Sequence, residues 1–323
     1  LIKPLRRFML AGYQVLKMRW WEREDLEVQN RRYAYQYHLM LIPVMIFLVI
    51  FHILPCFGIV IAFQKFIPAK GILGSEFVGL KYFEQMFRMS NSWRIFRNTI
   101  VIACWKIVMN MIVPIVFSIL LNELRHEAYK RTVQTVVYLP HFMSWVVLAI
   151  PIMNIFAYDG IVNDIITALG GTPIMFLASN TWFRPILILT DVWKEFGFGT
   201  IVYLAAITGI DPALYEAAVI DGASRGQRML HVTLPGMLPT IVLLATRSLG
   251  NVLNAGFDQI YNLYIPAVYE TADIIDTYVY RAGLIDMNYS LSTAVGLMKS
   301  VISIVLILTS NHLAYRLANY RIF

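Results

Sequence analysis

The sequence EAAVIDGASRGQRMLHVTLP occupies residues Glu216–Pro235 and forms a short polar break between two long apolar segments. Just before it, Asp211 can cap a helix whose first residue is Pro212, a position that suits proline because its N–H would have no partner there. Apolar residues then recur at helical spacing until Gly222, which ends the helix because glycine takes positive φ at no steric cost. The pattern predicts a short helix that stops at a glycine bend.

A second short helix is predicted after this bend. Ser224 and Gln227 have the spacing of a capping box, and Pro235 and Pro239 mark the exit toward the next apolar segment. Two helices with apolar and charged faces around a glycine form a projection that suits docking in the groove of a partner. The alternative interpretation is an ordinary connection between two membrane spans.

Composition places the chain in a membrane. Apolar residues make up 58% of it and charged residues 15%, against roughly 45–50% and 25% in soluble domains. A helix needs about 20 apolar residues to cross a hydrocarbon core, and six segments meet this requirement. These predicted spans cover approximately 38–63, 98–121, 133–157, 183–208, 236–262 and 290–317. The predicted fold class is all-α, a polytopic membrane protein with six transmembrane helices.

The distribution of basic residues orients the predicted spans. With both termini in the cytoplasm, the inner segments hold about twice as many Lys and Arg as the outer loops, as the positive-inside rule expects. The polar break, residues 211–235, is then cytoplasmic. This orientation and contact with anionic headgroups account for the net charge of +7, so we expect no nucleic-acid partner.

Three parts of the chain are expected: a cytoplasmic or interfacial segment over 1–37, a six-span domain over 38–318 and a cytoplasmic tail over 319–323. The first segment mixes aromatic, apolar and basic residues, which predicts either a helix along the inner membrane surface or a cap on the core. No cleavable signal peptide is expected, because the first apolar run is too long and begins too late.

Motifs of catalysis are absent from the sequence. Without a G-x-x-x-x-G-K-[ST] phosphate loop, we expect that the chain does not hold ATP itself, so that any ATP and Mg²⁺ used with it would be held by a separate ATPase partner. The chain also lacks H-E-x-x-H, G-x-S-x-G and Cys/His metal spacings. Its two cysteines, Cys56 and Cys104, fall in predicted spans as packing residues. We therefore expect a non-catalytic subunit that binds no metal and no cofactor of its own.

The polar break resembles the EAA loop in the membrane subunits of bacterial ABC importers. That loop reads E-A-A-x3-G-x9-I-x-L-P, and this chain matches it with Val232 in place of the isoleucine. The resemblance implies that the loop receives the work of ATP hydrolysis, that Glu216 pairs with an arginine in the ATPase cleft, and that Gly222 permits the bend. The residues expected to couple to the ATPase are Glu216, Ala217, Ala218, Asp221, Gly222, Leu234 and Pro235.

Further segments resemble sugar-importer permeases of the maltose type, and among them the branch that handles complex oligosaccharides, including pectin- and alginate-derived uronides. These segments are Phe51–Pro55, Ile61–Phe66, Phe77–Phe83, Tyr138–Val147, Asn254–Gln259, Tyr264–Glu270 and Ile275–Tyr280. The resemblance implies a second, similar permease subunit, a dimer of ATPase subunits inside, a solute-binding protein outside and an oligosaccharide substrate. It implies the inner membrane of a bacterium as the location.

Polar side chains inside the predicted spans indicate a passage, because charge in a bilayer is costly and faces protein or water. The fifth predicted span carries four of them at intervals that form one polar stripe on a helix. The candidate passage residues are Asp191, Trp193, Lys194 and Glu195 in the fourth span, Arg247, Asn251, Asn254 and Asp258 in the fifth, and Lys299 in the sixth. The tryptophan could offer a ring face to a sugar.

The opposing interpretation is that these charges neutralise one another. Asp191 would then pair with Lys194 within one helix. Alternatively, Glu195 would pair with Arg247 between helices, and the asparagines would serve as interhelical hydrogen bonds. Since acids and bases are both present, charge counting does not decide between an acidic and a neutral oligosaccharide.

Two other polar positions have mainly structural interpretations. Lys106 with Asn110 is expected to be a structural pair. His141, next to Pro140, is expected to be a helix-kink residue with a hydrogen-bonded ring, with a proton-sensitive group as the alternative.

We predict one half of the transmembrane channel of an ATP-driven oligosaccharide importer that works by alternating access. One alternative is a secondary transporter driven by an ion gradient, although no inverted repeat is detectable. The other is an ABC permease for a neutral sugar, a polyol or a glycerol phosphate.

Overall fold

The computed structural model describes residues 35–124 and 126–318 of the chain. Two compact units are present, Leu1–Val60 and Ile61–Phe323. The predicted N-terminal segment, apart from its last residues, and the whole predicted tail lie outside the described residues.

An apolar helical stretch, Tyr35–Phe63, begins in the first unit and ends at the start of the second, and it is long and apolar enough to cross a membrane. The helix widens into the π-helical turn η1 (Val49–Ile53) directly before α3 (Leu54–Cys56), and it ends as the 3-10 helix η2 (Phe57–Phe63). Proline lacks an N–H and its ring clashes with the carbonyl four residues earlier, so a wider turn ahead of Pro55 accommodates it. The predicted first span, 38–63, lies within the stretch Tyr35–Phe63.

The second unit is built from helices, with two very short strands. Its described α-helices are α4 (Lys81–Arg88), α5 (Ser92–Asn122), α6 (Glu127–Tyr138), α7 (Trp145–Ile155), α8 (Ile161–Ala168), α9 (Phe183–Thr208), α10 (Pro212–Ile220), α11 (Arg225–Arg228), α12 (Leu234–Gly250), α13 (Phe257–Leu263), α14 (Tyr269–Ala272), α15 (Ile275–Tyr280) and α16 (Tyr289–Ala318). The short 3-10 and π turns are η3 (Pro68–Lys70), η4 (Leu139–Phe142), η5 (Phe176–Ala178), η6 (Met229–Thr233), η7 (Pro266–Val268) and η8 (Arg281–Ile285). The antiparallel strands are β1 (Gln64–Lys65) and β2 (Glu76–Phe77).

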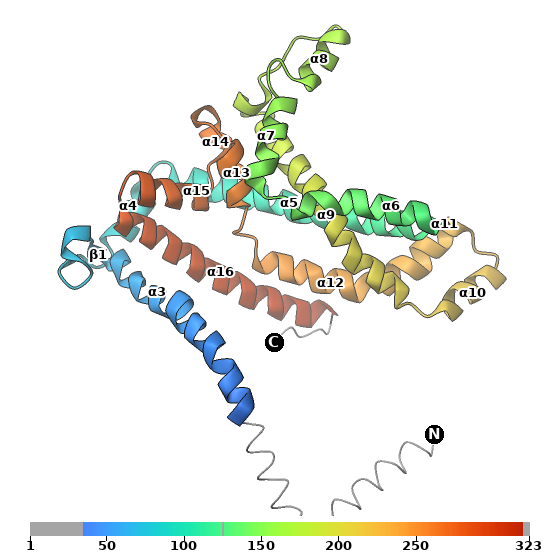
Figure 1. The fold of residues 1–323 in the computed structure, drawn as a ribbon, viewed down its shortest axis with the longest axis horizontal. Coiled ribbons are helices and arrows are strands. Elements are labelled where there is room, and N and C mark those ends of the chain that lie inside the picture. The colour runs from blue at the N-terminus through green and yellow to red at the C-terminus, as the bar shows by residue number, and fades with distance from the viewer. Residues whose placement is uncertain (1–34, 125, 319–323) are drawn as a thin grey trace, which may run out of the picture. The chain divides into compact units, whose positions relative to one another are not determined.

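Long helices pack in pairs within the second unit. Helix α5 lies along α9, and α12 lies along α16 (Figure 1). A buried core forms where α5, α7, α9 and α13 meet, and includes Ile102, Leu148, Phe183, Leu187 and Ile260. Gly197 lets α9 approach α6 closely, because an added Cβ would overlap the carbonyl oxygen of Val137.

The membrane-spanning content of the described chain agrees with the predicted six spans. Four helices are long and apolar enough to span a membrane: Tyr35–Phe63, Ser92–Asn122, Arg225–Gly250 and Tyr289–His312. Two bent pairs meet the same criteria jointly, Glu127–Phe142 with Trp145–Ile155, bent by 105°, and Phe183–Thr208 with Pro212–Ile220, bent by 70°. If each pair is one span, the total is six, and the all-α polytopic prediction is confirmed.

The predicted third span, 133–157, is not one continuous helix. Pro140 lies at the start of the 3-10 turn η4, and the chain changes direction before α7 begins at Trp145. Ser144 caps α7 by accepting a hydrogen bond from the N–H of Val147. The structure thereby confirms the kink expected beside Pro140.

The predicted fifth span, 236–262, is wrong at both ends. The spanning helix begins at Arg225, because it continues through the π turn η6 and past Pro235 without ending. It ends at Gly250, and the chain then leaves the helical path until Gly256, whose φ is +94°. Helix α13 begins only after that glycine.

Candidate functional site

The local structure predicted for the polar break is present in the structure. The Asp211 side chain accepts a hydrogen bond from the N–H of Ala213 at 2.9 Å, with Pro212 at the first position of α10. Gly222 has φ +79°, and the Ser224 capping box begins α11. In contrast to the prediction, α11 is not a separate short helix, because it continues into the fifth span.

Helix α10 presents most of its surface to its surroundings. Glu216 is exposed, as are Leu214, Val219 and Ile220, the last at 85% of its surface. Among the predicted coupling residues, the exposed ones are Glu216, Ala217, Asp221, Gly222 and Pro235, while Ala218 and Leu234 are half-buried. The face next to the bend is hollowed into a depression of about 330 Å³. A charge among exposed apolar side chains is a surface suited to a protein partner.

A polar cavity of about 430 Å³ lies between α5, α9 and α12. Five of the nine candidate passage residues line it: Asp191, Glu195, Arg247, Asn251 and Asn254. Lys106, Asn110 and Ser248 add polar groups to the same wall. The structure thus gathers side chains from three helices around one space, although their role in transport stays a prediction.

Asp191 is neutralised by a buried lysine from the neighbouring helix. The Lys106 Nζ lies 2.9 Å from Asp191 Oδ1, and Asn110 donates to Asp191 Oδ2 at 2.8 Å. The same ammonium donates to the carbonyl of Ala255 at 2.9 Å and to the side chain of Gln259. Lys106 and Asn110, predicted to be a structural pair, both bind Asp191. Both side chains also line the cavity.

Glu195 is paired with a lysine on its own helix and contacts a histidine ring nitrogen. Lys194 Nζ lies 2.8 Å from Glu195 Oε1, and His141 Nδ1 lies 2.7 Å from Glu195 Oε2. The His141 ring also stacks on Phe198 at 4.0 Å. Neither predicted pairing, Asp191 with Lys194 or Glu195 with Arg247, is formed in this structure.

Arg247 differs from the other charged residues that line the cavity. It is exposed, and its guanidinium has no ion-pair partner among residues 35–124 and 126–318. Since the two acids of the cavity are already paired, Arg247 leaves an uncompensated positive charge. A guanidinium is suited to bind a carboxylate through two parallel hydrogen bonds.

The remaining candidate passage residues lie elsewhere. The predicted stripe is broken at the end of α12, because Asn254 lies in the non-helical connection that follows Gly250. Asp258 belongs to α13 and is exposed outside the cavity. Trp193 is 46% exposed and does not line the cavity either. Lys194 is buried and donates to the carbonyl of His141 at 3.0 Å. Lys299 borders two other depressions.

Close approach explains the glycine at the helix break. A Cβ at Gly256 would lie 2.6 Å from Lys106 Nζ. The positive φ of Gly256 would also strain any other residue at this position. Gln259 extends the contact by donating to the carbonyl of Leu187 and the hydroxyl of Thr190, both at 2.8 Å. The sequence signal for Gln259 was a polar side chain among the apolar residues of a predicted span.

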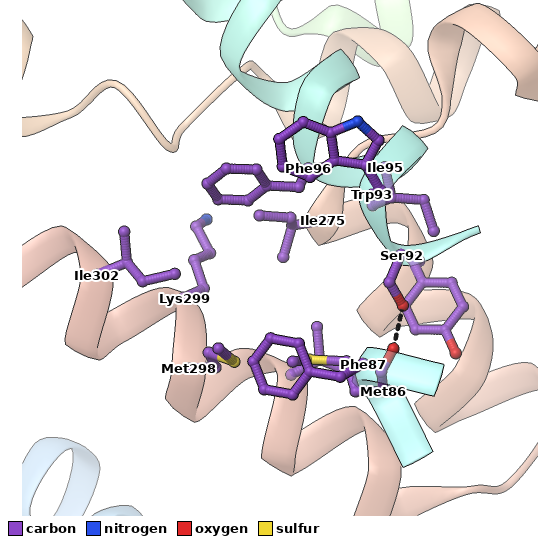
Figure 2. Close-up of a pocket in the computed structure, with 12 residues that line it drawn as sticks. Met86, Phe87, Ser92, Trp93, Ile95, Phe96, Ile275, Met298, Lys299 and Ile302 are labelled. Atoms are coloured by element: carbon purple, nitrogen blue, oxygen red, sulfur yellow. Dashed lines mark hydrogen bonds between the residues drawn. The ribbon is translucent and has the colours of Figure 1, made fainter. Parts of the chain in front are cut away.

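A second cavity, of about 370 Å³, lies between α4, α5, α15 and α16, and most of its lining is apolar (Figure 2). Trp93, Phe96 and Phe87 face it together with the lysine side chain of Lys299. This composition suits a hydroxyl-rich ligand less well than the lining of the polar cavity does.

Comparison with known proteins identifies the family of this chain. Residues 114–319 match the family described as binding-protein-dependent transport system inner membrane component. The chain is 42% identical to the polygalacturonan/rhamnogalacturonan transport system permease protein YteP of Bacillus subtilis, over 92% of each protein. It is also 42% identical to the protein LplB of Bacillus subtilis, over 86% of this chain and 87% of that protein.

Solved structures give the same match. A chain of a bacterial ABC transporter involved in the import of the acidic polysaccharide alginate has a TM-score of 0.82 and 37% identity, covering 90% of this chain and 98% of that chain. The alginate transporter in complex with an alginate pentasaccharide-bound periplasmic protein has a TM-score of 0.83, also at 37% identity, covering 91% of this chain and 99% of that chain.

Proposed function

We propose that this chain, which belongs to the family of binding-protein-dependent transport system inner membrane components, forms one half of the membrane passage of an ATP-driven importer for acidic oligosaccharides. The family makes the chain a transport component and a multi-pass inner membrane protein. It also argues against a transporter driven by an ion gradient.

The observation that carries the acidic substrate is the charge balance of the polar cavity. Asp191 and Glu195 are both paired with lysines, so neither opposes an anion there. Arg247 lines the same space without an ion-pair partner in the described part of the chain. A uronic acid residue supplies the carboxylate that such a guanidinium recognises.

Known proteins support the same choice of substrate. YteP is named for polygalacturonan and rhamnogalacturonan, and the solved transporters import alginate. More distant relatives are named for lactose and for trehalose and maltose, at 30% and 28% identity. A neutral oligosaccharide is therefore the alternative that the charge of the cavity disfavours.

The importer requires further subunits, which we infer from the exposed surfaces of this chain. A second, similar permease completes the passage, and a solute-binding protein delivers the ligand from outside. Two ATPase subunits hold ATP and Mg²⁺ in the cytoplasm, and one of them docks on α10, where Glu216 is exposed. Both termini of this chain lie in the cytoplasm, and the chain itself holds no cofactor.

Co-purification tests this proposal. The chain is purified from membranes that contain its native partners, and ATPase activity is measured with binding protein and either acidic or neutral oligosaccharides. We expect a second permease and an ATPase to elute with it, and hydrolysis to rise with the acidic ligand. Elution of the chain alone, or hydrolysis that ignores every oligosaccharide, would contradict the proposal.

A further inference from the structure

A third depression, of about 550 Å³, lies at the start of α16 and is bordered by α13, α15 and η8. Figure 1 shows α15 beside this end of α16, and α13 contacts α15. The opposite end of α16 leads to the C-terminus, so with cytoplasmic termini the depression lies toward the outer surface. It is separate from the apolar cavity of Figure 2, although Lys299 borders both.

Aromatic rings from three elements line this depression: Phe257, Tyr280 and Tyr289. Phe257 and Tyr280 pack together with ring centres 5.4 Å apart, and Tyr261 supports both at 5.3 and 4.7 Å. The three rings that line it are half-buried, so each keeps part of its surface accessible. Fixed aromatic rings with polar tips offer apolar contact area at low entropic cost.

The polar groups of the depression form a charge-balanced set. Lys299 Nζ lies 2.5 Å from Asp276 Oδ1 and donates to Asn254 Oδ1 at 2.9 Å. An ammonium has three donors, a carboxylate has two oxygens, and an amide has donors as well as an acceptor. Each of the three side chains therefore retains groups that can bind hydroxyls, and their charges cancel.

Asn254 lines both the polar cavity and this depression. The two spaces are therefore neighbours, on either side of one asparagine. The two spaces differ in chemistry. The polar cavity has a guanidinium without an ion-pair partner in the described part of the chain, while the outer depression combines aromatic rings with a neutral ion pair.

We infer that the outer depression is a second carbohydrate subsite, which takes a further sugar residue of the same oligosaccharide by ring stacking and hydroxyl hydrogen bonds and does not read its carboxylate. This inference rests on the proposed function. In this scheme the two sites recognise different features of the substrate. Arg247 selects for charge, and the outer subsite selects for chain length.

The test is uptake by proteoliposomes that contain the whole transporter with its binding protein. Acidic disaccharides and tetrasaccharides are compared in wild type, Tyr280→Ala and Phe257→Ala. We expect KM to rise about tenfold for the tetrasaccharide, which spans both spaces, and little for the disaccharide. Tyr280→Phe keeps the ring and should lie closer to wild type than Tyr280→Ala. Tyr129→Ala, an exposed tyrosine on α6, is the matched control.

The possible failures are distinguishable. Unchanged KM for the tetrasaccharide in both ring variants overturns the outer subsite, and so does an equal rise for both lengths. Selection for acidic over neutral sugars by wild type would still uphold the proposed function in those cases. If wild-type transporter imports no oligosaccharide, the proposed function fails, and the subsite with it.

Discussion

At the scale of single residues, the buried pair of Lys106 and Asp191 gives the clearest prediction. Asp191→Asn leaves a buried ammonium without its counter-charge, and breaking a buried pair in this way costs about 3–5 kcal/mol. We therefore expect a lower melting temperature of the detergent-solubilised protein. Asp258→Asn is the control, because Asp258 is exposed and forms no ion pair in the described chain. An equal melting temperature for Asp191→Asn and Asp258→Asn would contradict the account.

Glu216 carries the second prediction at this scale. It is exposed on α10, and the match to the EAA loop implies an arginine partner on the ATPase. Glu216→Ala should weaken ATPase binding by about 2–5 kcal/mol, because the partner charge is left unpaired. The measurement is the dissociation constant of the ATPase in detergent, with Glu127→Ala, an exposed acid on α6, as control. ATPase binding as tight as that of wild type would remove Glu216 from the interface.

The sequence alone identified most of the charged residues near the membrane interior but not their partners. Pairing depends on which helices face each other, and spacing along one helix does not reveal that. His141 and Asp276 were missed as ion-pair partners, of Glu195 and Lys299 respectively, for this reason. Only the assembled pairs show that, among the described residues, Arg247 lines the polar cavity without an ion-pair partner.

At the scale of elements, the glycine at the helix break is predicted to matter more for stability than the glycine of the EAA-like bend. Both have positive φ, so an alanine at either costs about 1–3 kcal/mol in backbone strain. A Cβ at Gly256 also meets Lys106 Nζ at 2.6 Å, whereas nothing lies within 4 Å at Gly222.

Thermal unfolding of the two alanine variants measures this difference. We expect Gly256→Ala to melt at a lower temperature than Gly222→Ala, since only the first displaces a buried ammonium. If Gly222→Ala melts at the same temperature as Gly256→Ala or at a lower one, the contact between a Cβ at position 256 and Lys106 Nζ does not lower stability.

Local signals predicted the elements well where capping chemistry decides them. The cap at Asp211, the bend at Gly222 and the box at Ser224 are all present. The error lay in treating Pro235 as the end of a helix, because a π turn before it lets the helix continue. Asn254 and Gly256 were likewise assigned to a continuous span, since the tertiary contact with Lys106 that holds the break has no signature in the local sequence.

At the scale of the whole molecule, chain connectivity links α10, the proposed docking surface for the ATPase, to the polar cavity. Helix α10 follows α9, which carries Asp191 and Glu195, and α11 continues into α12, which carries Arg247. A movement of α10 and α11 therefore acts on two walls of the polar cavity at once. Such a movement shifts the equilibrium between states only if ATP or the loaded binding protein binds one state better.

The hydrogen bond between Tyr215 and Thr233 ties α10 to the π turn, at 3.0 Å. Tyr215→Phe removes about 0.5–1.5 kcal/mol of this connection, so we expect fewer sugar molecules imported per ATP hydrolysed. Thr233→Val should have a similar effect, and the double variant should add little because both changes break one contact. Tyr129→Phe is the control. Fully additive losses in the double variant would contradict this role.

The measurement that tests the central claim most directly is the ratio of uptake of acidic to neutral oligosaccharides by proteoliposomes that contain the complete transporter. Wild type should prefer the acidic ligand, and Arg247→Gln should lower kcat/KM for that ligand about tenfold or more while leaving the neutral one nearly unchanged. Arg88→Gln, which removes an exposed positive charge on α4, should keep the preference. A wild-type transporter without preference, or an Arg247→Gln variant that keeps it, would contradict the account.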